Sequence, residues 1–233
     1  MNATTLDLLK NLGADLGQPA IGDRPLASLD FDLPPDHIDF LAAINGLTAY
    51  HGAFRLFGFR NGGDLDIADW NAVETWRFAW GGRAEGYVYF GETALGDQYA
   101  YRLKPGSARS LGPEVYFLQA TLLTPQVIAE SFEEFLDLEF IRNMREPYDR
   151  LIVEAVETLG AISPAENWSY APAIALGGPE EVSHLLRLPA AVAMTYSGDI
   201  VTGIYDNPTK NALAVVPWTD ERGRSRLRLD FGA

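Results

Sequence analysis

The sequence predicts a mixed α+β fold built around the centre of a sheet. Residues 87–103 alternate aromatic and other side chains with a period of two, on both sides of a loop bracketed by Gly91 and Gly96, a pattern typical of two paired strands. Ser131 stands three residues before Glu134, a spacing that predicts a capped helix start. Residues 213–218 and 224–231 flank a polar turn and predict a closing hairpin.

The composition limits which kinds of molecule the protein is expected to bind. The chain has 233 residues, 47% of them hydrophobic, and 32 acidic against 18 basic residues give a net charge of −14. This length can form one large domain or two small ones. The charge repels nucleic-acid phosphates and anionic lipid, and it attracts a basic partner. The absence of cysteine excludes disulfides and thiolate-ligated metals.

The sequence also indicates a compartment. Residues 1–7 lack the basic and apolar segments of a signal peptide. No apolar run reaches the roughly 18 residues that a membrane span needs. We therefore expect a cytoplasmic protein that has no membrane partner.

The first half of the chain alternates helix and strand signals. Residues 6–12 are amphipathic, and a helix beginning near Pro35 ends at Asn45 and Gly46. A short strand is expected at 54–59 and a helix at about 70–78. After the central hairpin, a third strand is expected at 115–118, and Thr124 with Pro125 ends the strand pattern.

The second half is predicted to be mainly helical. Helices are expected at 131–141 and at 148–159, the latter ended by Gly160. Ser163 with Glu166 forms a second capping box, and Pro179 followed by acidic residues predicts one more helix start. A break near 144–147 divides the chain into residues 1–145 and a smaller helical and hairpin extension, residues 146–233.

Several motifs occur together in one order. They are LPPDHIDFLAAING at 33–46, GAFRLFG at 52–58, Phe90 with Gly91, Gly96 with Asp97, Val115 with Tyr116, and SFEEFL at 131–136. This order resembles the SMI1/KNR4 family of the SUKH superfamily over about residues 30–140. Residues 170–178 resemble an extension found on some bacterial relatives, including immunity proteins.

The resemblance implies both a fold and a role. The fold is α+β, with a mostly antiparallel central sheet flanked by helices. Many bacterial members are immunity proteins that bind and neutralise toxins, and fungal members act as scaffolds in cell-wall signalling. The shared motifs look structural, so the resemblance carries over no catalytic residue.

Two acidic surfaces are candidate partner sites. Asp64–Asp69 lies beside a cluster of tryptophans, which would anchor a basic protein if they were exposed and would otherwise lie in the core. A helix with Glu133 on its acidic face is the second candidate. The residues expected to contact the partner are Asp64, Asp66, Asp69, Trp70, Trp76, Glu133, Glu134 and Asp137.

Other chemistry finds less support in the sequence. Glu92 and Asp97 flank the central loop and could act as acid and base if they met, although Asp97 suits a tight turn. The acidic run at 64–69 lacks the glycine and glutamate of an EF-hand, and no pair of histidines has the HExxH spacing. The alternating arginines Arg222, Arg224, Arg226 and Arg228 suit protection of an edge strand.

These observations predict a non-catalytic protein without cofactor or metal. We expect an immunity protein that binds a basic bacterial toxin. A scaffold for a cellular partner is the alternative, and an enzyme or sensor with a small-molecule pocket near Glu92 and Asp97 is a third. Genetic neighbourhood distinguishes the first two.

Overall fold

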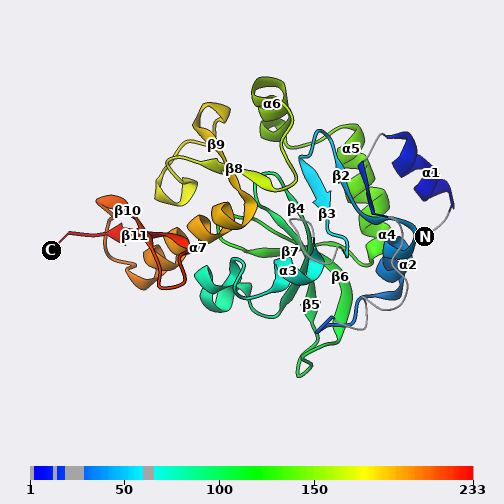
Figure 1. Ribbon diagram of the computed structural model, residues 1–233, viewed down its shortest axis with the longest axis horizontal. Coiled ribbons are helices and arrows are strands. Elements are labelled where there is room, and N and C mark those ends of the chain that lie inside the picture. The colour runs from blue at the N-terminus through cyan, green and yellow to red at the C-terminus, as the bar shows by residue number, and fades with distance from the viewer. Residues whose placement is uncertain (1–2, 13–14, 19–28, 60–65, 233) are drawn as a thin grey trace.

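A seven-stranded antiparallel sheet forms the centre of the computed structural model (Figure 1), which describes residues 3–12, 15–18, 29–59 and 66–232. Its strands lie side by side in the order in which they occur along the chain. They are β1 (Asp15–Gln18), β2 (Asn45–Ala49), β3 (Phe54–Leu56), β4 (Tyr87–Thr93), β5 (Gln98–Leu103), β6 (Leu111–Leu118) and β7 (Pro125–Ala129). The predicted α+β class with its antiparallel central sheet is confirmed.

The predicted central hairpin is β4 and β5. Val88 pairs with Tyr101, and a bulge between Tyr89 and Gly91 shifts the register. Gly91 has no room for a side chain, because a Cβ there would lie 2.5 Å from the carbonyl oxygen of Arg55. The hairpin therefore packs closely against β3, as a central strand pair must.

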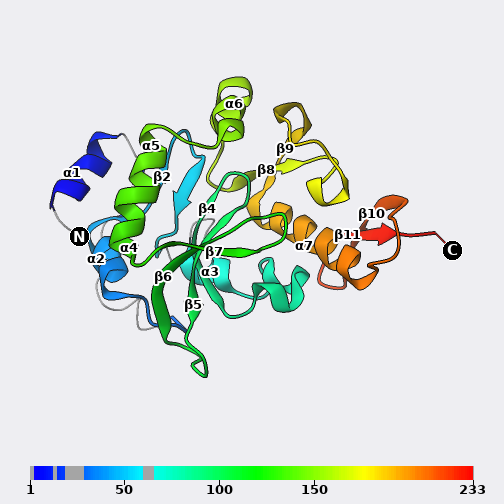
Figure 2. The ribbon, with the colours of Figure 1, turned by 180° about the vertical axis from the view of Figure 1, so that it is seen from behind.

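Helices lie on both sides of the sheet (Figures 1 and 2). They are α1 (Ala3–Asn11), α2 (Pro35–Ala43), α3 (Ile67–Asn71), α4 (Phe132–Glu134) continued by a π-helical turn (Phe135–Phe140) and α5 (Ile141–Arg145), α6 (Arg150–Leu159) and α7 (Ala190–Asp206). In Figure 1, α1 and α2 lie near α4 and α5. Helix α7 lies towards the opposite end of the molecule, close to the C-terminus. Among the described helices, none is both long and apolar enough to span a bilayer.

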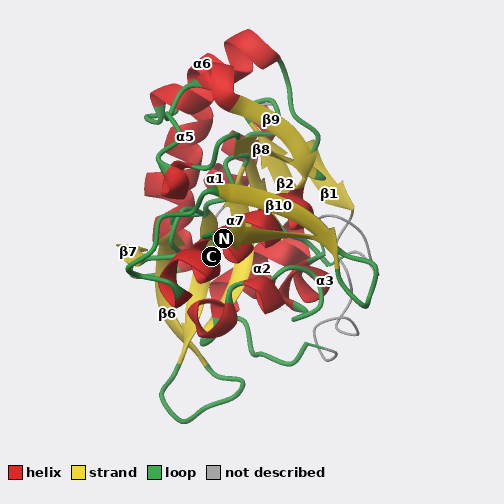
Figure 3. Ribbon diagram, turned by 90° about the vertical axis from the view of Figure 1, so that its left-hand side faces the viewer, coloured by secondary structure: helices red, strands yellow, loops and turns green. Residues whose placement is uncertain are grey.

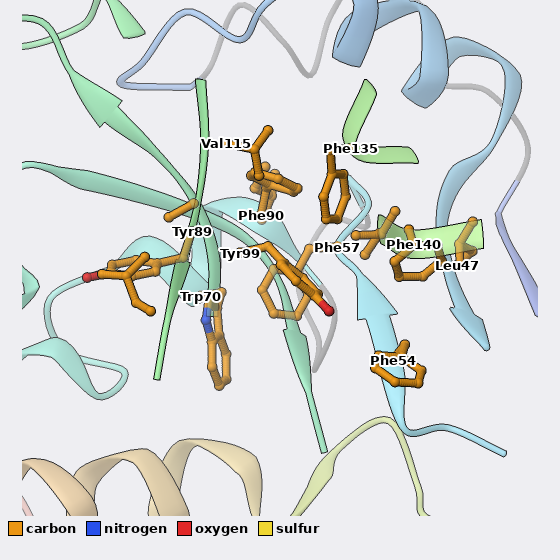
Figure 4. Close-up of a cluster of buried hydrophobic side chains, with 14 of the residues drawn as sticks. Leu47, Phe54, Phe57, Trp70, Tyr89, Phe90, Tyr99, Val115, Phe135 and Phe140 are labelled. Atoms are coloured by element: carbon orange, nitrogen blue, oxygen red, sulfur yellow. The ribbon is translucent and has the colours of Figure 1, made fainter. Parts of the chain in front are cut away.

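An aromatic core joins the sheet to the α4 segment (Figure 4). The rings of Phe90 and Tyr101 stack with centroids 4.6 Å apart, and Phe135 meets Phe90 edge-on at 5.5 Å. On the sheet's other side Tyr89 packs edge-on against Trp76 at 5.0 Å. The alternation in residues 87–103 thus supplies two buried faces, which is why both are aromatic.

Four sequence predictions about elements are wrong. The helix expected at about 70–78 does not form, because α3 ends at Asn71 and residues 77–79 form only a 3₁₀ turn. Ser163 does not start a helix, because residues 166–170 form β8 (Glu166–Tyr170), which pairs with β9 (Leu185–Pro189). The helix expected after Pro179 is only a 3₁₀ turn (Val182–His184) before β9. Pro125 begins β7 rather than ending the strand pattern, and an edge strand tolerates proline because one side needs no donor.

The closing hairpin, β10 (Ala214–Thr219) and β11 (Ser225–Asp230), is confirmed. It lies against α7 (Figure 3), where Arg226 Nε donates to Asp199 at 2.9 Å. Arg224 Nε donates to Asp220 at 2.7 Å. At least these two of the alternating arginines hold the hairpin in place.

The segment after residue 145 packs tightly on the sheet. Trp80 Nε1 donates to the Met194 carbonyl at 2.9 Å, and the Trp168 amide donates to the Ala94 carbonyl at 2.7 Å. The division of the chain at 145/146 stays a prediction, which a truncation can test.

Candidate functional site

A cleft of about 170 Å³ opens where the central sheet meets the C-terminal segment. Its walls come from the β4–β5 loop, residues 119–121 after β6, the start of α6, β8, residues 173–180 and α7. Segments far apart in the sequence thus form one site. The packing of β8 and α7 beside the β4–β5 loop creates it.

The walls of the cleft are apolar and aromatic. Trp168, Phe117, Met194 and Ile200 line it. Trp168 is buried, and its Nε1–H has no hydrogen-bond acceptor among the described residues. A buried indole N–H usually finds a partner, so this donor marks an incompletely satisfied wall.

Three carboxylates from separate segments add negative charge to the cleft. Asp97 ends the β4–β5 loop, Asp149 caps α6 through the Leu151 amide, and Glu180 lies in the loop before β9. Tyr170 of β8 shares the cleft, and burial together with these carboxylates raises the pKa of its hydroxyl.

Asp97 is held in place by its own turn. Its carboxylate accepts from Thr93 Oγ1 at 3.1 Å and from the Ala120 amide at 2.8 Å. Burial, with smaller contributions from nearby Asp149 and Glu180, raises the pKa of Asp97 to about 6, although these hydrogen bonds act to lower it. An ionised Asp97 is therefore costly until a positive charge enters the cleft.

Glu92, the other carboxylate of the central loop, serves a different purpose and does not line the cleft. It is fully buried and accepts from Arg55 Nη1 at 2.8 Å. Gln98 and Asn167 also donate to it. The idea that Glu92 and Asp97 act together as acid and base is wrong, because Arg55 neutralises Glu92 inside the core.

The predicted tryptophan anchors are also buried. Trp70 is 5% exposed and Trp76 is 0% exposed, so neither forms a surface patch. Trp70 Nε1 donates to Gln98 Oε1 at 2.8 Å, and Trp76 Nε1 donates to the Trp70 carbonyl at 3.0 Å. Their expected contact with a partner is wrong, and the alternative of a core cluster is correct.

The aspartates beside these tryptophans differ in exposure. Asp66 is buried and caps α3, accepting from the Ala68 and Asp69 amides. Asp69 is exposed. Asp64 lies outside the described residues. Among the described aspartates of this group, Asp69 is the exposed one. The Asp66 carboxylate is instead used to cap the start of α3.

The acidic α4 face is accessible. Glu133 and Asp137 are exposed. Glu134 is half-buried, and its carboxylate accepts from the Glu130 amide at 2.7 Å, while its amide donates to Ser131 Oγ at 3.2 Å. The predicted helix cap is present. Partner contact through this face stays a prediction.

No sequence pattern pointed to Asp149, Glu180, Trp168 or Met194. Each looked ordinary alone, and they meet only because β8 and α7 fold back onto the central loop. Within the described ranges, no group of three or more His, Asp or Glu side chains is placed to hold a metal ion.

Comparison with known proteins identifies the sheet region. Residues 27–138 match the model of the SMI1 / KNR4 family (SUKH-1). Over this stretch the chain is similar to the family, and we refer to residues 27–138 as the SUKH-1 domain. The SUKH-1 domain supplies residues 95–97, Phe117 and the 119–121 wall of the cleft, and the rest of the lining comes from residues after it.

The fold likeness extends beyond the SUKH-1 domain. The crystal structure of Atu4351 from Agrobacterium tumefaciens superposes with a TM-score of 0.54 and 14% identity, covering 93% of this chain and 94% of that chain. At this identity the likeness shows the fold alone. No curated protein sequence matches the chain significantly.

Proposed function

We propose that this protein is a non-catalytic protein-binding module, an immunity protein that neutralises a cognate bacterial toxin by direct binding. The SUKH-1 domain at residues 27–138 is the observation that carries the proposal, because many bacterial members of this family neutralise toxins. A toxin bound at its active site is blocked without any chemistry by the immunity protein.

The charge of the chain supports a basic partner. A net charge of −14 creates a field that speeds the encounter with a positively charged protein. Glu133 and Asp137 on the α4 segment and Asp69 on α3 are exposed and can take part in this attraction. Association should therefore slow as salt is added.

Co-expression with the product of the neighbouring gene tests the proposal. We expect that product to be toxic when expressed alone, harmless with this protein, and bound to it in size-exclusion chromatography. A neighbouring product that is not toxic and does not bind would overturn the proposal.

A charge-matched pair of variants tests the predicted surface. The double variant Glu133→Gln/Asp137→Asn should lower the association rate about threefold to tenfold in surface plasmon resonance, since rim charges act mainly on that rate. The control Glu154→Gln/Glu157→Gln removes the same charge from exposed positions of α6. Equal effects of the two pairs would indicate that net charge, and not this face, steers the partner.

A further inference from the structure

We infer that the cleft between the β4–β5 loop, β8 and α7 binds an organic cation: an ammonium or guanidinium group on a short apolar stem. A free amine and the side chain of a lysine or arginine share this chemistry. The inference stands on the cleft itself and does not depend on the proposed function.

Charge favours a cation. Asp97, Asp149 and Glu180 line the cleft from three separate segments. Among the described residues, no basic side chain makes an ion pair with any of the three. The cleft thus concentrates negative charge that the described part of the chain does not neutralise, whereas the buried Glu92 has its own arginine.

The walls favour a cation with an apolar stem. Met194 and Ile200 of α7 offer aliphatic contact, and the aromatic residues Trp168, Tyr170 and Phe117 offer rings whose faces attract positive charge. A hydrated inorganic ion would not use these apolar and aromatic walls.

The size of the cleft limits the ligand. Its volume of about 170 Å³ is below the roughly 300–1,000 Å³ of sites for drug-sized molecules. It has room for one amino-acid side chain or a small amine. This favours a ligand with a single cationic head group.

The affinity of the cleft for a cation should depend on pH. Because the pKa of Asp97 is raised to about 6, this carboxylate is largely neutral below that pH and ionised above it. Asp149 and Glu180 are the charged groups that act on it. A bound cation favours the ionised form, so affinity should rise between pH 5 and 7.

Titration calorimetry of the full chain tests the inference with three probes: butylammonium, N-acetyl-lysine methylamide and the neutral isostere 1-butanol. We expect saturable binding of at least one cation, weaker at pH 5 than at pH 7, and none of 1-butanol. Selective binding of butylammonium would point to a free amine, and selective binding of the lysine derivative to a protein side chain. Absence of saturable cation binding, or equal binding of 1-butanol, would overturn the inference.

Two single-charge variants locate the site. Glu180→Gln changes an exposed residue that lines the cleft, and it should weaken cation binding about twofold to fivefold, as expected for one solvent-exposed charge pair. Glu154→Gln removes an equal charge from an exposed position outside the cleft lining and should leave affinity unchanged. Equal affinities of the two variants would place the cation elsewhere and overturn the inference. The co-expression test of the proposed function is unaffected by either result.

Discussion

Arg55 and Glu92 form an ion pair inside the protein, with both side chains fully buried. Besides Glu92, Arg55 donates to Asn167 Oδ1 at 2.7 Å and to the Glu166 carbonyl at 2.5 Å. Burial lowers the pKa of Arg55 and raises that of Glu92, and each partner's charge opposes the shift. The pair therefore persists only because its hydrogen bonds are complete.

We predict that Glu92→Gln lowers the free energy of unfolding by about 3–5 kcal/mol, because Arg55 is left as an uncompensated buried charge. Urea denaturation followed by tryptophan fluorescence measures the loss. Glu133→Gln, at an exposed position, is the control and should change stability by less than about 0.5 kcal/mol. A similarly small loss for Glu92→Gln would contradict the account.

A second prediction concerns Asp97 and pH. Its pKa is raised from 3.8 to about 6 in the folded protein, so the folded state holds the proton more tightly than the unfolded chain does. The stability that this protonation contributes is complete below about pH 4 and is lost as the pH rises through about 6. The neutral variant Asp97→Asn avoids this loss.

The difference in melting temperature between Asp97→Asn and the unchanged protein should therefore shift in favour of the variant as the pH rises from 4.5 to 7.5. This shift is expected whichever of the two is more stable at low pH. Scanning calorimetry across this range measures the difference, and Asp137→Asn, at an exposed position, serves as the matched aspartate variant. A difference that stays flat across the range would show that Asp97 is not the titrating group.

At the scale of elements, α7 depends on a glycine at its contact with the sheet region. Gly198 faces Trp80, and a Cβ there would lie 2.7 Å from Trp80 Cδ1. Trp80 is itself fixed, because it is fully buried and its Nε1 bonds to the Met194 carbonyl of the same helix. The glycine lets α7 and this indole approach closely.

Gly198→Ala should therefore destabilise the protein by about 1–3 kcal/mol, as expected for overpacking, although alanine favours a helix over glycine by about 1 kcal/mol. The matched control is Gly203→Ala on the same helix, where the nearest atom is 3.1 Å away at the end of the Leu229 side chain. Thermal unfolding of both variants measures the contrast. A Gly198→Ala protein as stable as Gly203→Ala would indicate that α7 shifts freely.

At the scale of the whole molecule, the segment after residue 145 completes the polar partners of the sheet. Residues 164–167 accept hydrogen bonds from Arg55, and Met194 accepts one from Trp80. A chain ending at residue 145 would leave these buried donors without acceptors, at a cost of about 1–3 kcal/mol for each neutral group and more for the charge.

We predict that the fragment 1–145 does not reach a cooperative native state by itself. Circular dichroism and the dispersion of amide signals in NMR spectra measure this, with the full chain as the control. Adding the separately produced fragment 146–233 should restore folding. A well-folded 1–145 fragment would instead establish the boundary as that of an independent domain.

Prediction from the sequence succeeded where the signal was local. The period-two pattern at 87–103, the Ser131 cap and the hairpin around 220–223 all depend on neighbouring residues, and all are present. It failed at residues 163–166, where a capping box competes with strand pairing to β9. It also missed α7, whose N-cap position is Pro189 without a capping side chain and whose interior contains Gly198 and Gly203.

The sequence by itself determined the class of fold, the central hairpin, the SUKH-1 resemblance and the acidic charge. Alternation and helix caps depend on residues adjacent in the chain, and net charge depends only on the total composition. Only the tertiary structure decided where the polar and aromatic side chains lie. It buried Trp70 and Trp76, paired Glu92 with Arg55, and brought Asp97 to Asp149 and Glu180 in one cleft. Burial and long-range contact depend on which surfaces pack together, and residue spacing along the chain does not encode that.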